Sequence, residues 1–297
     1  ATRITDDDDL GYNFLKDYPY ELHRFETDEA FSKFAIDERF DYIFLDQLST
    51  SPEYIQALKK SGAKVITFED LGEGALDADL VINDLYKIPN ISDQKQLHGL
   101  KYALLQQTFH ATTPRGAPKE SVESILVIFG GTDPSNLTVR SLSALRSIGY
   151  SGEVTVIQGL GCADRNIDLD EYGLNGEVLT NVQDVAKVMV SADMAISSAG
   201  RTITELMTMR VPTLCICQNE RGLTHSHASQ MYGVHNIGLG NLVSDDTIEA
   251  NIRFLIDNHD FRKTMYQRAK DVMKDRSNQS VINKIAEKLC DKALCDE

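Results

Sequence analysis

The sequence contains no long apolar run. None of its stretches approaches the ~18 residues that a membrane-crossing helix needs, and its first residues show no basic segment followed by an apolar one. These absences predict a cytoplasmic protein with no membrane span. Five cysteines, an odd number, predict free thiols in a reducing compartment rather than a disulfide framework.

Basic residues are in the minority. There are 30 Lys and Arg against 45 Asp and Glu, which gives a net charge of -15. A charge of this sign repels phosphate backbones at long range, so nucleic acid is not expected as a partner. A nucleotide stays compatible, because a few backbone amides and a helix end suffice to hold one.

The 297 residues, of which 42% are hydrophobic and 25% charged, are typical of a globular protein of two domains. Short apolar runs alternate with helical periods, which predicts an α/β fold with parallel strands. Strands are expected at 42–45, 64–68, 78–83, 124–129, 153–158, 194–197, 213–217 and 236–239, and the last helices at 246–258 and 260–290. The segment 112–118 is interpreted as a linker between a domain of residues 1–114 and one of residues 120–297.

The first half is short for a doubly wound domain. Such a unit begins with a strand, a glycine-rich turn and a helix, and no such turn precedes Tyr42. We therefore predict that the first βα unit is missing from the N-terminal domain. The acidic run Asp6 to Asp9 is expected to be a solvated surface stretch.

Two segments of the second half are typical of ligand loops at strand ends. Gly130, Gly131 and Thr132 follow a predicted strand, and glycine there lets a phosphate approach the main chain closely. The alternative is a plain strand-to-helix turn in which Asp133 and Pro134 start the helix.

The second segment comprises Ser198, Ala199, Gly200, Arg201 and Thr202, and it runs from a strand straight into a helix. Amides of a first helical turn lack internal partners and suit a diphosphate. Three residues after Thr202, the carboxylate of Glu205 is placed to reach ribose hydroxyls. The alternative is a capping box, in which Glu205 folds back onto the amide of Thr202.

Further polar residues follow other strands. Cys215 and Cys217 lie two apart in a predicted strand, which indicates small core residues rather than a zinc site. The remaining candidates stand past strand ends: Asn219 and Glu220 as substrate contacts, His225 and His227 as general bases or else surface histidines, and Asp46 and Asp70 as substrate contacts or else turn carboxylates.

The segments GGTDP, SSAGRTITELMTMRVPTLCI, QNERGLTHSHA, FEDL, DADLVIND and LHGLKYALLQQTF together resemble the nucleotide-sugar hydrolase of the pseudaminic acid pathway, a family with the GT-B fold. The resemblance spans residues 42–240. It implies two Rossmann-like domains facing a cleft, a UDP-sugar as ligand, cleavage of its anomeric C–O bond, and no cofactor or nucleotide-bound metal. It also implies a role in nonulosonate or surface-polysaccharide biosynthesis.

By this resemblance Gly130, Gly131 and Thr132 lie near the phosphates, residues 198–202 supply helix-end amides, and Glu205 takes the ribose. The base is lined by Ile157, Gln158 and Gly159, and Asn219 faces the sugar. The family's GxGHxxR turn, which carries its catalytic histidine, has no counterpart here, and Leu48 stands where the family has tyrosine. His225, His227 and Asp70 are the replacement bases to test. The alternative hypothesis is a non-catalytic nucleotide-sugar-binding module, associated with an upstream domain or a partner enzyme.

Overall fold

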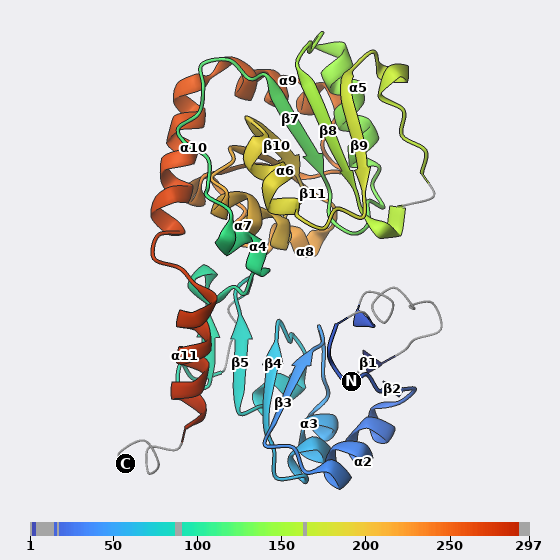
Figure 1. Ribbon diagram of the computed structural model, residues 1–297, viewed down its shortest axis with the longest axis vertical. Helices are drawn as coiled ribbons and strands as arrows, with labels where there is room; N and C mark the ends of the chain where they lie inside the picture. Colours follow the sequence, from blue (N-terminus) through green and yellow to red (C-terminus); the bar gives the residue numbers. More distant parts are fainter. Residues whose placement is uncertain (1, 4–14, 17, 87–90, 163–164, 291–297) are drawn as a thin grey trace. The chain divides into compact units, whose positions relative to one another are not determined.

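The computed structural model describes residues 2–3, 15–16, 18–86, 91–162 and 165–290. By their contacts these residues form two compact units (Figure 1). Unit 1 comprises residues 1–102 together with 282–297, and unit 2 comprises residues 103–281. Each unit contains its own parallel sheet.

Unit 1 is built around a four-stranded parallel sheet in the order β3-β4-β5-β6. Its elements are β1 (Thr2–Arg3), β2 (Arg24–Phe25), α2 (Asp28–Glu38), β3 (Tyr42–Asp46), α3 (Pro52–Lys59), β4 (Lys64–Phe68), η1 (Glu73–Leu76), β5 (Leu80–Asn83), β6 (Gln96–His98) and η2 (Leu100–Tyr102). The side chain of Ser51 caps α3 and Pro52 occupies its first turn, residue types that favour a helix start. Ile43, Leu45 and Val65 form a core with α2 and α3 on one face of the sheet. The predicted loss of the first βα unit concerns a stretch in which residues 1, 4–14 and 17 lie outside the described residues, as does the run Asp6 to Asp9.

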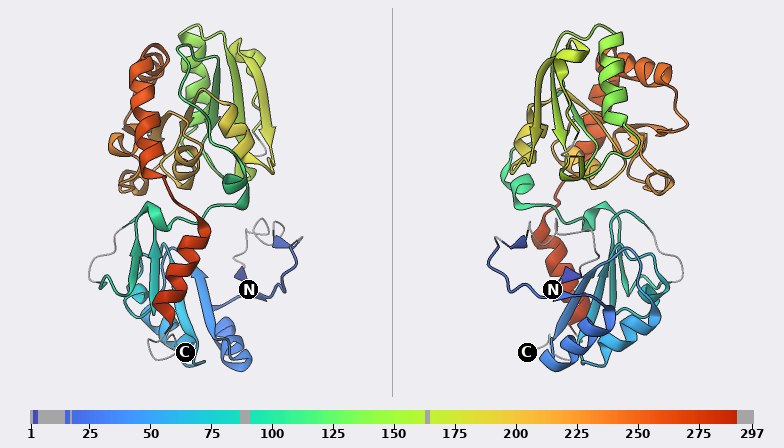
Figure 2. Two further views of the ribbon diagram at one scale, coloured as in Figure 1. Left: turned by 60° about the vertical axis from the view of Figure 1, so that its left-hand side comes forward. Right: turned by 90° about the vertical axis from the view of Figure 1, so that its right-hand side faces the viewer.

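Unit 2 has a six-stranded parallel sheet in the order β12-β11-β10-β7-β8-β9. Figure 1 labels five of these strands, β7 to β11, and Figure 2 shows the unit from two further sides. Its elements are α4 (Gln107–Ala111), β7 (Ser124–Ile128), α5 (Leu137–Ser147), β8 (Glu153–Gln158), η3 (Leu160–Cys162), η4 (Leu169–Tyr172), β9 (Asn175–Thr180), α6 (Val185–Ser191), β10 (Met194–Ser197), α7 (Arg201–Thr208), β11 (Thr213–Cys217), α8 (Glu220–Leu223), η5 (Gln230–Tyr232), β12 (Val234–Leu239), α9 (Asp245–Asp257), α10 (His259–Val272) and the start of α11 (Asn278–Leu289). Counted from β7 this is the doubly wound order 3-2-1-4-5-6, which reverses between β7 and β10.

Both faces of the unit 2 sheet are covered, because successive residues of a strand point to opposite sides. On one face Ile125 and Val127 pack with Leu142 of α5 and Ile252 of α9. The other face, from Leu126 and Ile128, packs against α4, α6 and α7. The continuous apolar runs of the sequence therefore belong to strands that are buried on both sides.

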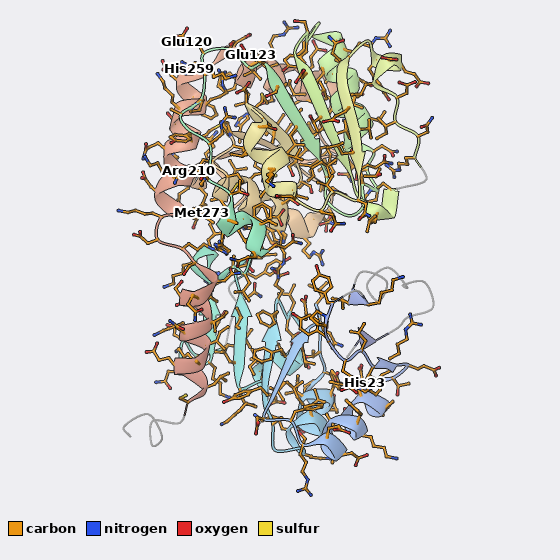
Figure 3. The ribbon with its side chains drawn as sticks, in the orientation of Figure 1. His23, Glu120, Glu123, Arg210, His259 and Met273 are labelled. Carbon is orange, nitrogen blue, oxygen red and sulfur yellow. The ribbon has the colours of Figure 1, made fainter. Side chains whose placement is uncertain are left out.

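The unit limits differ from the predicted domain limits of 114 and 120. Residues 103–114 belong to unit 2, where the segment that follows them is anchored by the Arg115 guanidinium, 2.8 Å from the Asp193 carboxylate. Burial alone would raise the pKa of Asp193, but the hydrogen bond from Arg115 holds it below its ordinary value. Further along, His259 Nε2 donates to the Pro118 carbonyl (2.9 Å); Figure 3 labels His259 and the neighbouring Glu120. The predicted linker at 112–118 is thus packed onto unit 2.

The predicted helix at 260–290 is in fact two helices, α10 and α11. Between them Asp275 has a φ of 59°, a left-handed conformation that ends a helix. The end of α11 belongs to unit 1, where the Lys288 ammonium donates to the carbonyls of Asp93 and Gln94 (both 3.0 Å). No helix within the described ranges has the length and apolar character to cross a bilayer.

Candidate functional site

The candidate site lies at the carboxyl ends of β7 and β10, where the strand order of unit 2 reverses. In open α/β sheets the loops leaving such a pair of strands diverge to opposite faces and leave a crevice between them, which is where ligands bind. The loop after β7 contains Gly130, Gly131 and Thr132, and the loop after β10 contains Ser198, Ala199 and Gly200. The two predicted loops are therefore brought to adjacent strands.

The loop after β7 contains its own anion. The carboxylate of Asp133, itself buried, accepts from the backbone N–H groups of Leu137 and Thr138 (both 2.9 Å), which are the first amides of α5. These are the groups that would otherwise attract a phosphate. The N-terminus of α5 is thus already neutralised, and the helical part of a phosphate site has to come from elsewhere. The sequence suggested Asp133 only as part of a plain helix start, and it did not predict that the carboxylate accepts from these amides.

The loop after β8 packs directly onto the loop after β7. A Cβ on Gly159 or Gly161 would lie closer than 3.0 Å to the Gly131 carbonyl, so both positions require glycine. The Gln158 amide is buried and donates to the carbonyls of Cys162 and Arg165, the latter at 2.7 Å. Gln158 therefore stabilises the loop after β8, and Gly159 lets that loop pack against the loop after β7. The predicted role of these two residues in lining the base stays a prediction.

The start of α7 has no side-chain cap. Gly200 is the N-cap residue and has no side chain to cap the helix, and Thr202 lies inside α7 rather than at its N-cap, so the capping box between Thr202 and Glu205 is not formed. The hydrogen bonds of the described residues include none donated by the backbone N–H of Gly131, Thr132 or Thr202. At the switch point, the start of α7 thus leaves the Thr202 amide without a hydrogen bond among the described residues, whereas the first amides of α5 are bonded to Asp133.

Glu205 follows one turn further along α7 and is largely buried. Burial raises its pKa to about 7, against the lowering influence of the Arg201 charge. A carboxyl group with such a pKa marks a site where a polar group is held in a low-dielectric environment. Its position on α7 allows it to accept hydrogen bonds from a ligand that sits on the first turn.

A single side chain joins the two loops. The Gln218 amide, after β11, donates to the carbonyls of Phe129 (2.6 Å) and Thr132 (3.1 Å) and lies 3.3 Å from the Ser198 hydroxyl. Gln218 was not among the predicted residues. Its place next to the predicted Asn219 at a strand end was the only signal for it. Asn219 caps α8 by accepting from Gly222 N–H (3.0 Å), and both Asn219 and Glu220 are exposed.

The two candidate histidines are buried and bonded to the backbone. His225 Nδ1 contacts the Ala199 carbonyl, and His227 Nε2 lies 3.5 Å from the Gly200 carbonyl. Their rings stack with centroids 5.7 Å apart. Both support the loop after β10.

The two predicted carboxylates of unit 1 differ sharply. Asp70 is fully buried and accepts from the N–H groups of Thr50 (3.0 Å) and Gly72 (2.9 Å) and from the Thr50 hydroxyl, which gives it a structural role in that turn. Asp46 ends β3, is exposed, and lines a cavity of 920 Å³ bounded by residues 15–54.

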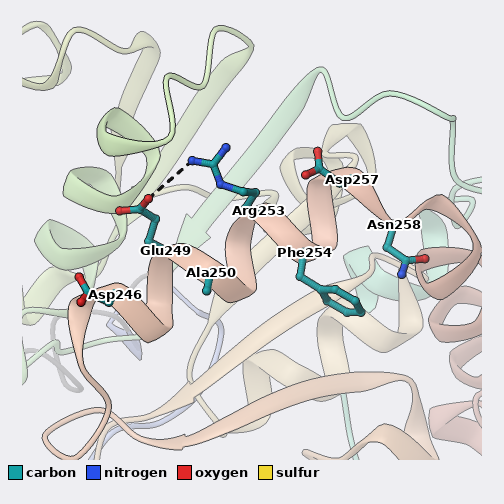
Figure 4. A pocket seen from close by; sticks show the side chains of 7 residues that line it. All are labelled: Asp246, Glu249, Ala250, Arg253, Phe254, Asp257 and Asn258. Atoms are coloured by element: carbon teal, nitrogen blue, oxygen red, sulfur yellow. Dashed lines mark ion pairs between the residues drawn. The ribbon is translucent and has the colours of Figure 1, made fainter.

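Two further features lie away from the strand-end loops or inside the core. Cys215 and Cys217 are buried core thiols, and within the described ranges no group of three or more His, Cys, Asp or Glu is placed to hold a metal ion. A hollow along α9 is lined by residues of that helix and its C-terminal neighbour alone (Figure 4). In it Glu249 and Arg253 pair at 3.6 Å, and no strand-end loop contributes to it.

Comparison with known proteins supports the architecture. No protein-family model matches the chain. It is 24% identical over 257 residues to the spore coat polysaccharide biosynthesis protein SpsG of Bacillus subtilis (strain 168), an alignment that covers 82% of this chain and 74% of that protein. It is 26% identical over 198 residues to the uncharacterized protein MJ1062 of Methanocaldococcus jannaschii, covering 61% of this chain and 41% of that protein.

Solved structures establish the fold class. MurG from Acinetobacter baumannii aligns with a TM-score of 0.67 at 13% identity, covering 94% of this chain and 88% of that chain. HepE from Anabaena, solved in complex with UDP and glucose, aligns with a TM-score of 0.62 at 12% identity and the same coverage. The chain has the GT-B fold of these glycosyltransferases, and the predicted α/β fold class is confirmed.

Proposed function

We propose that the protein binds the UDP moiety of a nucleotide sugar at the switch point of unit 2. The observation that carries this proposal is the uncapped start of α7 beside two glycines that face open space. A Cβ added to Gly131 or Gly200 would meet nothing within 4 Å, and neither glycine has a positive φ. Neither packing nor backbone conformation accounts for them, whereas a diphosphate lying on the main chain does.

In this proposal, three sets of protein groups each contact a different part of the nucleotide sugar. The backbone amides of Gly131, Thr132 and Thr202 contact the diphosphate, Glu205 accepts from the ribose hydroxyls, and Asn219 faces the sugar. Support for UDP as the nucleotide comes from the resemblance of the sequence and from similar folds solved with UDP bound. The likeness to SpsG supports a role in surface-polysaccharide biosynthesis, with nonulosonate synthesis as the finer assignment.

The test is calorimetric titration of UDP into the full chain. We expect Gly131→Ala and Gly200→Ala each to weaken UDP binding by about tenfold or more, since a methyl group displaces the diphosphate from its amides. Gly116→Ala is the matched control, because its Cβ also meets nothing within 4 Å and its φ is not positive. Absence of UDP binding by the unaltered chain, or equal affinities in all three variants, refutes the proposal.

The finer proposal is hydrolysis of the bound UDP-sugar. The oxygen of a water molecule forms a bond to the anomeric carbon, the C–O bond to the diphosphate breaks, and the water's proton passes to a general base. Helix-end amides stabilise the negative charge on the departing UDP. Measuring UDP release from UDP-sugars separates this proposal from the non-catalytic module: binding without release favours the module. Association with an upstream domain or a partner enzyme stays a prediction.

A further inference from the structure

The parallel sheet of unit 1 has one long open edge. β3 lies at the end of the strand order β3-β4-β5-β6 (Figure 1), and among the described residues it pairs with β4 alone. An edge strand presents a row of backbone N–H and C=O groups on the side away from its neighbour. The free side of β3 therefore offers hydrogen-bond donors and acceptors to a further strand.

A cavity of 920 Å³ runs along this free side. Its lining includes every residue from Tyr42 to Ser49. Neighbouring residues of a strand point to opposite faces of the sheet, so a cavity that touches all of them lies beside the strand rather than over one face. Ile43 and Leu45 are buried with α2 and α3, whereas Tyr42 and Phe44, on the opposite face, are about half exposed.

The other wall of the cavity is formed by β2, by α2 and by the residue Phe40 that follows α2, and it is rich in aromatic rings. The ring centroid of Phe25 lies 5.4 Å from that of Phe31 and 5.1 Å from that of Phe34. The Phe34 and Phe40 rings lie 5.8 Å apart, and all four residues line the cavity. A strand placed beside β3 would therefore pack its apolar side chains against aromatic surface.

The charge of the cavity is of one sign. Among the described residues that line it, four are carboxylates and none is lysine or arginine. The carboxylates are Glu21, Asp28, Glu38 and Asp46. A polypeptide segment that enters this cavity is favoured when it carries positive side chains, because the two charge patterns are then complementary.

β3 also lacks the features with which proteins protect an edge strand. It pairs with β4 over five consecutive residues without a bulge, and its sequence YIFLD contains neither proline nor lysine. β6, at the other end of the same sheet, has only three residues. The long, regular and open edge is thus the one that the cavity accompanies.

We propose that the free edge of β3 is an interaction surface for a partner protein, which adds an extended basic segment to the sheet as a further strand. The backbone of this segment pairs with β3, its apolar side chains pack between β3 and α2, and its lysine or arginine side chains face the carboxylates of the cavity. The inference is independent of UDP binding, because every residue that it uses belongs to unit 1.

The experiment uses the full chain and a defined peptide, an octapeptide of alternating valine and lysine, whose affinity is measured by fluorescence anisotropy. Valine suits a strand, and lysine supplies the positive charge. Two N-methylated forms, one modified at the valines and one at the lysines, each lose the backbone donors along one edge of the peptide and keep its side chains. An octapeptide of alternating valine and glutamate reverses the charge. Hydrogen–deuterium exchange followed by mass spectrometry locates the bound peptide.

We expect the unaltered chain to bind the valine–lysine peptide saturably, and the bound peptide to slow amide exchange in residues 42–46. At least one N-methylated form, and the valine–glutamate peptide, are expected to bind about tenfold more weakly or worse. Glu38→Lys is expected to weaken binding of the valine–lysine peptide about fivefold. Asp37→Lys is the matched control, because this exposed carboxylate precedes Glu38 in α2 and is not part of the cavity lining; its affinity stays within about twofold.

Four outcomes overturn the inference. The first is the absence of saturable binding, and the second is equal affinity of both N-methylated forms and the parent peptide, which would mean that the occupant does not pair as a strand. The third is an equal effect of Glu38→Lys and Asp37→Lys. The fourth is a chain that sediments as a dimer and has residues 42–46 protected before any peptide is added, which would assign the edge to a second copy.

Discussion

Replacing Glu205 by glutamine tests the environment of the α7 carboxyl group without any ligand. Burial raises the pKa of Glu205 from its ordinary value of 4.5 to about 7. The native state therefore holds this proton more tightly than the unfolded state does between these two pH values. Its contribution to the free energy of unfolding is most favourable below pH 4.5, decreases as the pH rises to about 7, and stays low above that. The whole change amounts to about 3 kcal/mol.

Urea unfolding at pH 4.5, 6 and 8 measures the effect. We expect the free energy of unfolding of Glu205→Gln, relative to the unaltered chain, to rise by about 3 kcal/mol between pH 4.5 and 8, because glutamine has no charge to bury. Glu177→Gln, on the exposed face of β9, is the control for general charge effects. A difference between Glu205→Gln and the unaltered chain that does not vary with pH would refute the reasoning, and with it the idea that α7 presents a desolvated carboxyl group.

Two further predictions concern the frame that holds the site. The Arg262 guanidinium is buried and donates to four carbonyls, those of Leu255, Ile256, Lys119 and Glu120, which Arg262→Met leaves unpaired. We expect urea unfolding of Arg262→Met to show a free energy of unfolding lower by about 3 kcal/mol. The control Arg253→Met, at an exposed arginine, is expected to lower it by less than about 0.5 kcal/mol. Gly159→Ala forces the loop after β8 away from the Gly130 and Gly131 carbonyls. We expect this substitution to lower the free energy of unfolding by about 2 kcal/mol and to weaken UDP binding. Unchanged stability would contradict the packing of the two loops.

Sequence patterns predicted the regular part of the fold because apolar periodicity reports burial directly. The runs at 153–158 and 213–217 became β8 and β11 with the predicted limits. β9 was missed because its sequence, NGEVLT, begins with a turn-like pair and has little apolar character, as suits an edge strand. The break between α10 and α11 was missed although residues 274–280, KDRSNQS, are all polar and interrupt the apolar spacing.

The location of the candidate site could be predicted from the sequence, whereas the contacts of its side chains largely could not. Glycines and small residues after two strands identified the loops, since the carboxyl ends of parallel strands share one edge. The partners of side chains were not predictable, because they depend on contacts across the sheet. Gln218 reaches a loop 89 positions earlier in the chain, and His225 reaches Ala199 from beyond α8. His225 and His227, interpreted as general bases or else as surface histidines, are in fact buried and contact backbone carbonyls.

Two helices, α5 and α7, begin where the strand order reverses, and they differ in whether a side chain occupies their first amides. The motif GGTDP places a carboxylate four residues before the first helical residue, and Asp133 occupies the amides of α5 much as a phosphate would. The motif SSAGRT contains no acidic residue before its helix, and the α7 amides remain without a side-chain cap. In the proposed site, the start of α5 is therefore already neutralised by Asp133, and the Thr202 amide at the start of α7 is the helical group that the diphosphate contacts. The glycines after β7 then serve to leave room for the ligand. We expect Asp133→Asn to lower the stability of α5 far more than it lowers the affinity for UDP, because the carboxylate bonds the α5 amides. Urea unfolding measures the first effect and calorimetric titration of UDP measures the second.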